Sequence, residues 1–311
     1  MSAELQSAAD VLMIRPLQFA GNPQTADSNR FQQSAPHLSA AQVQAAAARE
    51  FEALAAALRA AGVTVHAFDD TPQPHTPDSI FPNNWVSFHA DGTVVLYPML
   101  AENRRQERRA DLLETLSSQL GFRIARVLDL THHESGGKFL EGTGSLVLDR
   151  AHRVAYACVS PRTDLDALGD FAQQLDYDVV AFEAADANGA PIYHTNVLMC
   201  IGARFAAICP DCIRDDERGA VLDALRRTGH ELVELSMEQL AAFAGNMLEL
   251  RTARGSVVAM SRTALDSLSA QQRATIERLG GPIVAAPIPT IETLGGGSVR
   301  CMLAEVHLPK K

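Results

Sequence analysis

The sequence is poor in cysteine and contains no long hydrophobic run. Five cysteines in 311 residues are an odd and sparse set, which argues against a disulfide framework and favours a reducing, cytoplasmic compartment. The longest apolar stretches, such as Ala53–Leu58 and Val197–Ile201, are far too short to cross a bilayer, so no membrane association is expected. The first ten residues include Glu4 and Asp10 and lack a basic start followed by an apolar stretch, so we expect no signal peptide.

Basic residues are also scarce. The chain has 27 Lys and Arg against 37 Asp and Glu, and its net charge of −10 disfavours a duplex nucleic acid as partner. The composition, 47% hydrophobic and 21% charged, excludes bulk disorder. A chain of this length buries about three quarters of its unfolded surface, and no linker or low-complexity segment divides it. We therefore expect one domain over residues 1–311.

A strand–strand–helix–strand pattern recurs along the chain. Four short hairpins begin near Asn84, Gly144, Asn196 and Asn246, at steps of 60, 52 and 50 residues. A helical pattern and a closing strand follow each hairpin. The predicted helices are Ala101–Leu120, Leu165–Leu175, Arg214–Arg227 and Ala264–Leu279. The predicted closing strands are Arg123–Leu128, Val179–Phe182, Glu231–Leu235 and Pro282–Ala286.

A fifth unit is divided between the two ends of the chain. Val11–Arg15, Ser39–Ala61 and Val63–Phe68 predict a strand, a helix and a closing strand, and Val299–Leu308 supplies the missing strand. Five units joined in this way make a ring that protects the repeat edges and leaves a central channel or cleft. The alternative is a generic α/β domain with regularly spaced strands.

Chemically capable residues precede the first strand of several units, so one rim of such a ring would bring them together. Cys301 follows Gly295-Gly296-Gly297, which permits close approach of the backbone to a ligand, and this makes the thiol a candidate nucleophile or else a buried structural cysteine. His194 can move protons, and Glu141 can bind an N–H group or shuttle a proton. Taken alone, His194 is more typical of a cap or a surface histidine, and Glu141 of a loop-edge charge.

Three other clusters are less informative. Cys209-Pro-Asp-Cys212 has no second pair of ligands at finger spacing, and adjacent histidines such as His132 and His133 rarely hold a metal alone, so no metal site is expected. The arginines between residues 104 and 109 are typical of a solvated helix face. From it, Arg104 or Arg105 could reach the rim and bind a carboxylate bidentately.

Three motifs taken together resemble those of the pentein superfamily, also called the guanidino-group-modifying or amidinotransferase superfamily. They are Gly-Gly-Gly-Ser-Val-Arg-Cys301-Met, Glu141-Gly-Thr-Gly and His194-Thr-Asn196. The resemblance covers nearly the whole chain and implies a five-bladed α/β propeller of ββαβ units, closed by the C-terminal strand and acting as one catalytic domain. The opening stretch and Phe81-Pro-Asn-Asn-Trp85 resemble the arginine-deiminase-related branch of citrulline-utilization hydrolases.

The resemblance implies a role for each matching residue. Cys301 is implied as the nucleophile on a guanidino or ureido carbon, and His194 as the group that protonates the departing amine and then activates water. Glu141 is implied as the carboxylate that binds the substrate NH groups. The covalent thio-intermediate needs no cofactor. The residues expected to bind substrate are Asp78, Phe81, Asn83, Asn84, Asn196 and Arg105.

Two positions depart from the deiminase pattern, because aspartates are usual where this chain has Asn84 and Asn196. Two carboxylates suit a cationic guanidinium, whereas neutral amides, which both donate and accept, suit a neutral ureido group better. The sequence therefore favours hydrolysis of citrulline to ornithine, CO2 and NH3, or arginine dihydrolysis through citrulline. The alternatives are an arginine or dimethylarginine deiminase-type hydrolase, an amidinotransferase, and a non-catalytic binding relative. A homodimer is left open.

Overall fold

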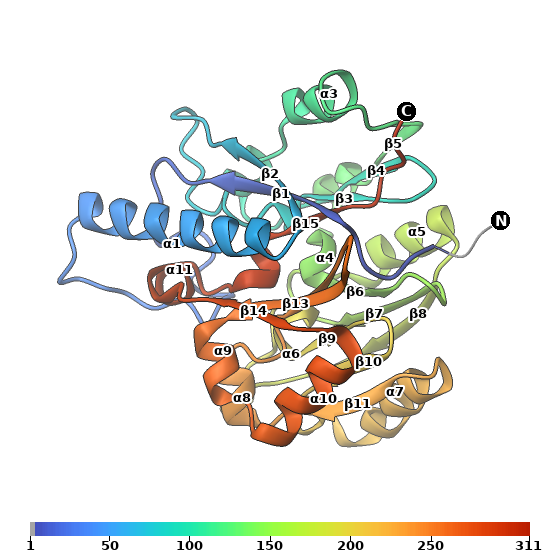
Figure 1. The fold of residues 1–311 in the computed structure, drawn as a ribbon. Coiled ribbons are helices and arrows are strands. Elements are labelled where there is room, and N and C mark those ends of the chain that lie inside the picture. The colour runs from blue at the N-terminus through green and yellow to red at the C-terminus, as the bar shows by residue number, and fades with distance from the viewer. Residues whose placement is uncertain (1–3) are drawn as a thin grey trace.

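The computed structural model, which describes residues 4–311, contains five three-stranded sheets (Figure 1). In each sheet an antiparallel hairpin is extended by a third, parallel strand, as the repeat predicts. Four sheets are continuous in the chain. They are β3 (Val86–Phe88), β4 (Thr93–Leu96) and β5 (Arg126–Asp129); β6 (Leu146–Asp149), β7 (Val154–Cys158) and β8 (Asp178–Phe182); β9 (Met199–Ile201), β10 (Phe205–Ile208) and β11 (Glu231–Glu234); and β12 (Leu248–Thr252), β13 (Gly255–Ser261) and β14 (Ile283–Ala286).

The fifth sheet joins the two ends of the chain, which confirms the divided unit. Strand β1 (Asp10–Arg15) pairs in parallel with β2 (Thr64–Asp69) and antiparallel with β15 (Ala304–Val306). The prediction of a strand over Val299–Leu308 is wrong for Val299–Met302, which form the 3-10 turn η4, and is confirmed for Ala304–Val306. The backbone N–H of Arg300 donates to the Asn246 side chain at 3.0 Å instead of joining a strand ladder.

Helices connect the second and third strands of each unit and lie on the outside of the molecule (Figure 1). The connecting helices are α1 (Ala40–Ala60), α3 (Ala110–Ser118), α5 (Leu165–Leu175), α7 (Asp215–Arg227) and α10 (Ala270–Gly280). Two predicted helices are broken. The first of them begins as the separate turn α2 (Glu102–Arg105), and the last begins as α9 (Arg262–Ser267), because Ser269 and Gln272 form a capping box that starts α10 anew.

Short turns, rather than extended strands, precede the first strand of four units. They are η1 (Pro82–Asn84) before β3, α4 (Gly142–Ser145) before β6, α6 (Thr195–Leu198) before β9, and η4 before β15. All their residues are buried, and η1 packs against both α4 and η4, while α4 packs against α6. The remaining turns are η2 (Thr131–Gly136), η3 (Pro210–Cys212), α8 (Met237–Ala241) and α11 (Pro289–Gly295).

Because these four turns pack against one another, the polar residues that they carry come together in one place, although they belong to different units. Apolar side chains fill the space between sheets and helices, and Trp85, Phe88 and Phe171 are each at most 1% exposed. The observed architecture is therefore the five-bladed α/β propeller of ββαβ repeats that the sequence predicts. Within residues 4–311, the helices are too short or too polar to traverse a bilayer.

Candidate active site

Cys301 lies in η4 and is 3% exposed, with two amide groups directed at its sulfur. Asn196 Nδ2 donates to Sγ at 3.4 Å and Asn246 Nδ2 at 3.3 Å. Asn246 also donates to the backbone oxygen of Asn196 at 2.9 Å, which holds the two amides together. Two N–H groups aimed at one sulfur stabilise negative charge there, as a nucleophilic thiolate requires.

His194 immediately precedes α6 and donates through Nε2 to Glu141 Oε2 at 2.9 Å. Glu141 is fully buried, and Arg162 and Arg104 lie 3.3 and 3.7 Å from the same oxygen. Burial alone would raise the pKa of Glu141, but Arg162, His194 and Arg104 outweigh it and hold that pKa well below its usual range. Glu141 is thus an ionised acceptor, and its other oxygen receives the N–H of Leu100 at 3.1 Å.

Burial lowers the pKa of His194 to about 4, although the hydrogen bond to Glu141 opposes the shift. The imidazole is therefore neutral at pH 7. Because the Glu141 carboxylate can only accept, the single ring proton resides on Nε2, and Nδ1 keeps a free lone pair. A Cβ on Gly144 would lie 2.7 Å from that Nδ1 and 2.4 Å from Asn84 Nδ2, so only glycine leaves room for both.

A narrow cavity of about 10 Å³ lies beside Cys301 and His194. Its walls come from η1, η4, the segment before α6 and the loop that connects β1 to α1. The lining residues are Asn29, Asp78, Phe81, Asn84, Arg104, Arg162, Tyr193, His194, Gly295, Gly297 and Cys301. The structure thus brings Cys301, His194, Asp78, Phe81 and Asn84 together, as the rim arrangement predicts.

Asn83 and Asn196 are buried beside the cavity but do not line it. Among residues 4–311, several polar atoms in this region are buried without a hydrogen-bond partner. They are Asp78 Oδ1, Asn84 Nδ2, Asn196 Oδ1 and both amide atoms of Asn83. Buried polar groups are normally paired, so the two such atoms on cavity-lining residues, Asp78 Oδ1 and Asn84 Nδ2, are available to a bound molecule.

The arginine that enters the cavity is Arg104, not Arg105. Arg105 instead donates to the backbone oxygens of Met99 and Leu100 at 3.0 and 3.3 Å, so the expectation that it binds substrate is not supported by its position. Arg104 is 2% exposed and donates through Nη1 to Asn84 Oδ1 at 2.9 Å. The break after α2 turns Arg104 inward, which the helical pattern of the sequence does not indicate.

Sequence reasoning missed Arg162, and no motif marks it. Its Nη1 lies 3.3 Å from Glu141, while Nε and Nη2 both reach Ser28 Oγ, at 3.2 and 2.7 Å. Ser28 belongs to a segment that covers the site, in which Asn22 donates to Asp78 at 2.8 Å and Asn29 to Gly295 O at 3.2 Å. The hydrogen bond from Asn246 to the Cys301 sulfur was also not predicted. The position of Asn246 at the start of a hairpin, which corresponds to that of Asn196, could have indicated it.

The lowered His194 pKa predicts acid-dependent stability. An unfolded chain binds a proton at His194 near pH 6.5 and the folded chain near pH 4, so unfolding is favoured as the pH falls between these values. We expect His194 to account for a loss of about 2 kcal/mol in unfolding free energy between pH 7 and pH 5. Urea unfolding of the wild type and His194→Gln at both pH values measures it. An equal pH dependence in both proteins would contradict the prediction.

Comparisons with known proteins identify the family and the fold. A model of eukaryotic N,N-dimethylarginine dimethylhydrolases matches residues 15–308. A comparison with curated proteins gives no match. The N-terminal domain of ArgZ, an arginine dihydrolase of the ornithine–ammonia cycle in cyanobacteria, has a similar structure, with 17% identity, a TM-score of 0.73 and coverage of 96% of this chain and 99% of that domain.

Full-length ArgZ gives a TM-score of 0.72 at 18% identity, and the alignment covers 97% of this chain but 41% of that protein. A dimethylarginine dimethylaminohydrolase adduct with S-methyl-L-thiocitrulline gives a TM-score of 0.62 at 15% identity, covering 96% of this chain and 99% of that one. These likenesses show a shared fold, and the family model spans nearly the whole sequence. The chain belongs to the N,N-dimethylarginine dimethylhydrolase family, within the pentein superfamily of hydrolases that act on guanidino C–N bonds of arginine derivatives.

Proposed function

We propose that residues 1–311 act as a single catalytic domain that hydrolyses the ureido group of citrulline, giving ornithine, CO2 and NH3. Cys301 is the nucleophile, His194 the proton carrier and Glu141 the residue that positions His194. Arginine is a further substrate if its guanidino group is first converted to the ureide. The observation that carries this proposal is the orientation of the Asn84 amide, which lines the cavity.

Hydrogen bonds fix which atom of each amide is free. Asn84 Oδ1 accepts from Arg104, so its unpartnered Nδ2 is a donor. Asn196 Nδ2 donates to the Cys301 sulfur, so its unpartnered Oδ1 is an acceptor. A guanidinium carries only donors and leaves Asn84 Nδ2 unsatisfied, whereas a ureido group offers its oxygen to Asn84 Nδ2 in the cavity. Leaving a buried donor unpaired costs about 1–3 kcal/mol, which favours the ureide.

The neutral His194 begins the reaction as a base. It takes the thiol proton of Cys301, and the sulfur forms a bond to the ureido carbon. The imidazolium, stabilised by ionised Glu141, then gives its proton to the side-chain nitrogen as the C–N bond to ornithine breaks. His194 next removes a proton from water, which attacks the S-carbamoyl group. The thiol is regenerated, and the released carbamate decomposes to CO2 and NH3.

Arg162 is the residue that we propose for the substrate carboxylate. Its Nε and Nη2 form the two-pronged fork that suits a carboxylate, and in this structure Ser28 Oγ occupies both prongs. Displacement of Ser28 by the substrate leaves the pairing of Arg162 with Glu141 intact. A citrulline analogue without the α-carboxylate should therefore show a lower kcat/KM, mainly through a higher KM.

A product assay tests the proposal. Purified protein is given citrulline, arginine or dimethylarginine, and ornithine, citrulline and ammonia are measured. We expect ornithine from citrulline. Asn84→Asp should lower citrulline turnover by about 10- to 100-fold, because the free donor becomes an acceptor, and should make arginine-to-citrulline conversion the faster reaction. Asn188→Asp, the same change at an exposed residue, is the matched control and should leave all rates unchanged.

The family model favours a second candidate, the hydrolysis of dimethylarginine to citrulline and dimethylamine. The same assay separates the two. Citrulline accumulating from arginine or dimethylarginine, with added citrulline left intact, would overturn ureide hydrolysis and establish a deiminase-type enzyme.

A further inference from the structure

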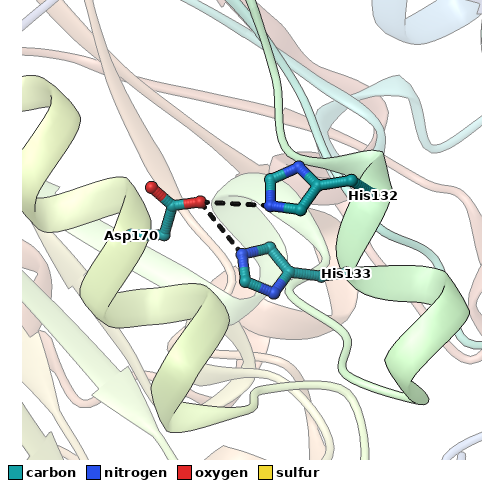
Figure 2. Close-up of side chains that lie close together, drawn as sticks. All are labelled: His132, His133 and Asp170. Atoms are coloured by element: carbon teal, nitrogen blue, oxygen red, sulfur yellow. Dashed lines mark hydrogen bonds and ion pairs between the residues drawn. The ribbon is translucent and has the colours of Figure 1, made fainter.

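Two histidines and an aspartate converge at the surface, outside the cavity that contains Cys301. His132 and His133 lie in η2, and Asp170 lies on α5, which the fold packs beside it (Figure 2). Figure 2 shows the two rings side by side, with both Nε2 atoms directed at Asp170. The distances to Asp170 Oδ2 are 3.5 Å from His132 and 3.0 Å from His133.

The hydrogen bond at the other nitrogen of His132 fixes its tautomer. Its Nδ1 lies 3.2 Å from the backbone oxygen of Asp129, which can only accept, so Nδ1 carries the proton of the neutral ring. The lone pair on Nε2 then faces the Asp170 carboxylate with no hydrogen between them. Metal-binding histidines are oriented in this way, by an N–H···O=C bond on the nitrogen that does not bind the ion.

The spacing of the three atoms fits one ion. Ligand atoms 2.0–2.1 Å from a tetrahedral ion lie about 3.3–3.4 Å apart, and the two observed distances to Asp170 bracket that value. The three ligand atoms all lie within 4.8 Å of one another. The His132 side chain is 63% exposed and that of Asp170 25%, so an ion and a completing water have access.

We infer that His132, His133 and Asp170 form a site for a divalent transition-metal ion of the zinc class. Two imidazoles and one carboxylate are ligands that Zn²⁺ and Co²⁺ accept, and three protein ligands leave the fourth position to water. His133 binds through Nε2 once its proton moves to Nδ1. The ion joins η2 to α5, and Glu134 of the same turn is paired with Arg108 at 2.5 Å, so the site is a structural clamp between two units of the propeller.

A second histidine–aspartate group supplies the matched control. Asp149, His152 and His230 also lie close together, but their atoms are already paired. His152 Nδ1 contacts both oxygens of Asp149, at 2.9 and 3.0 Å, and His230 Nδ1 contacts Thr228 Oγ1 at 2.9 Å. This group satisfies itself without an ion, whereas the lone pair of His132 is left facing a carboxylate.

The experiment measures Zn²⁺ binding by equilibrium dialysis in a Cys301→Ala background, because a reactive thiol is itself a zinc ligand. Co²⁺ absorption in the visible range reports the coordination, and thermal melting with and without Zn²⁺ reports the linked stabilisation. The variants are His132→Asn, His133→Asn and Asp170→Asn. The controls are His152→Asn and Cys209→Ala. Melting of each protein without metal, which should be nearly unchanged, shows that it is folded.

We expect one equivalent of Zn²⁺, bound at least tenfold more weakly by each of the three variants and equally by both controls. The rise in melting temperature with Zn²⁺ should disappear in the same three variants. Affinity that is unchanged in the variants, or is lost in His152→Asn or Cys209→Ala instead, would overturn the site. Failure of the parent protein to bind Zn²⁺ at 100 times its own concentration would overturn it as well.

Discussion

Cys301→Ala is expected to release no measurable ornithine from citrulline, with kcat lower by a factor on the order of 10⁴ to 10⁶. The reason is that Cys301 supplies the only thiol among the residues that line the cavity. The only hydroxyl among them is the Tyr193 phenol. That phenol is already bonded to Gly296 O, and burial raises its pKa far above the working range. Ornithine and ammonia release measures the effect.

Cys200→Ala is the matched control for this experiment. Cys200 is equally buried, in β9, and burial raises the pKa of its thiol to about 12, so it is not a thiolate at neutral pH. We expect kcat to change less than twofold. Retained activity in Cys301→Ala would contradict the covalent mechanism, and iodoacetamide that modifies Cys200 before Cys301 would contradict the assignment of the nucleophile.

His194→Gln should lower kcat by about 10² to 10⁴-fold with a much smaller change in KM. Glutamine retains a hydrogen bond to Glu141 but cannot exchange protons with the thiol, the amine and water. Because water activation also depends on His194, any S-carbamoyl adduct formed on Cys301 should persist. Intact mass spectrometry after mixing with citrulline measures that adduct, which a merely structural role for His194 would not produce.

His307→Gln separates this effect from the general cost of changing a buried histidine. Burial also lowers the pKa of His307, whose Nε2 bonds to Glu305 at 3.2 Å outside the cavity. This variant should lose stability and keep its kcat. A fall in kcat as large as that of His194→Gln would indicate that both changes act through the fold.

The repeat was predictable because its signal is local. Short β-prone runs around a Gly- or Asp-containing turn, each followed by a helix of 3.6-residue period, define a unit without knowledge of its neighbours. Four hairpins at nearly constant spacing then placed Asp78, Asn84, His194 and Cys301 at corresponding points, and the structure brings these residues to one cavity. The strand predicted around Cys301 was wrong, because hydrogen bonds to the Asn246 side chain take the place of backbone hydrogen bonds to a neighbouring strand there.

The rest of the site depends on contacts that no local pattern records. Arg104 and Arg105 are adjacent and chemically identical, and only the break after α2 decides which one faces inward. Arg162 lies in a turn after β7 and contacts Glu141, which is 21 residues away in the sequence. Asp170 likewise joins His132 and His133 only through the packing of α5 beside η2, so adjacent histidines gave no sign of a third ligand.

The pairing of β15 with β1 has a consequence for synthesis of the protein. Val11 and Glu305 are partners, although nearly the whole chain separates them. The nucleophile immediately precedes β15, so it emerges from the ribosome after the strands of the other four sheets have been made. A nascent chain therefore carries no working thiol until β15 has been made and has paired with β1, and this nonlocal closure is expected to be a late and slow event in folding. The appearance of catalytic activity therefore indicates that the ring of five sheets is complete. A chain truncated before Cys301 lacks both the nucleophile and the strand β15 that pairs with β1.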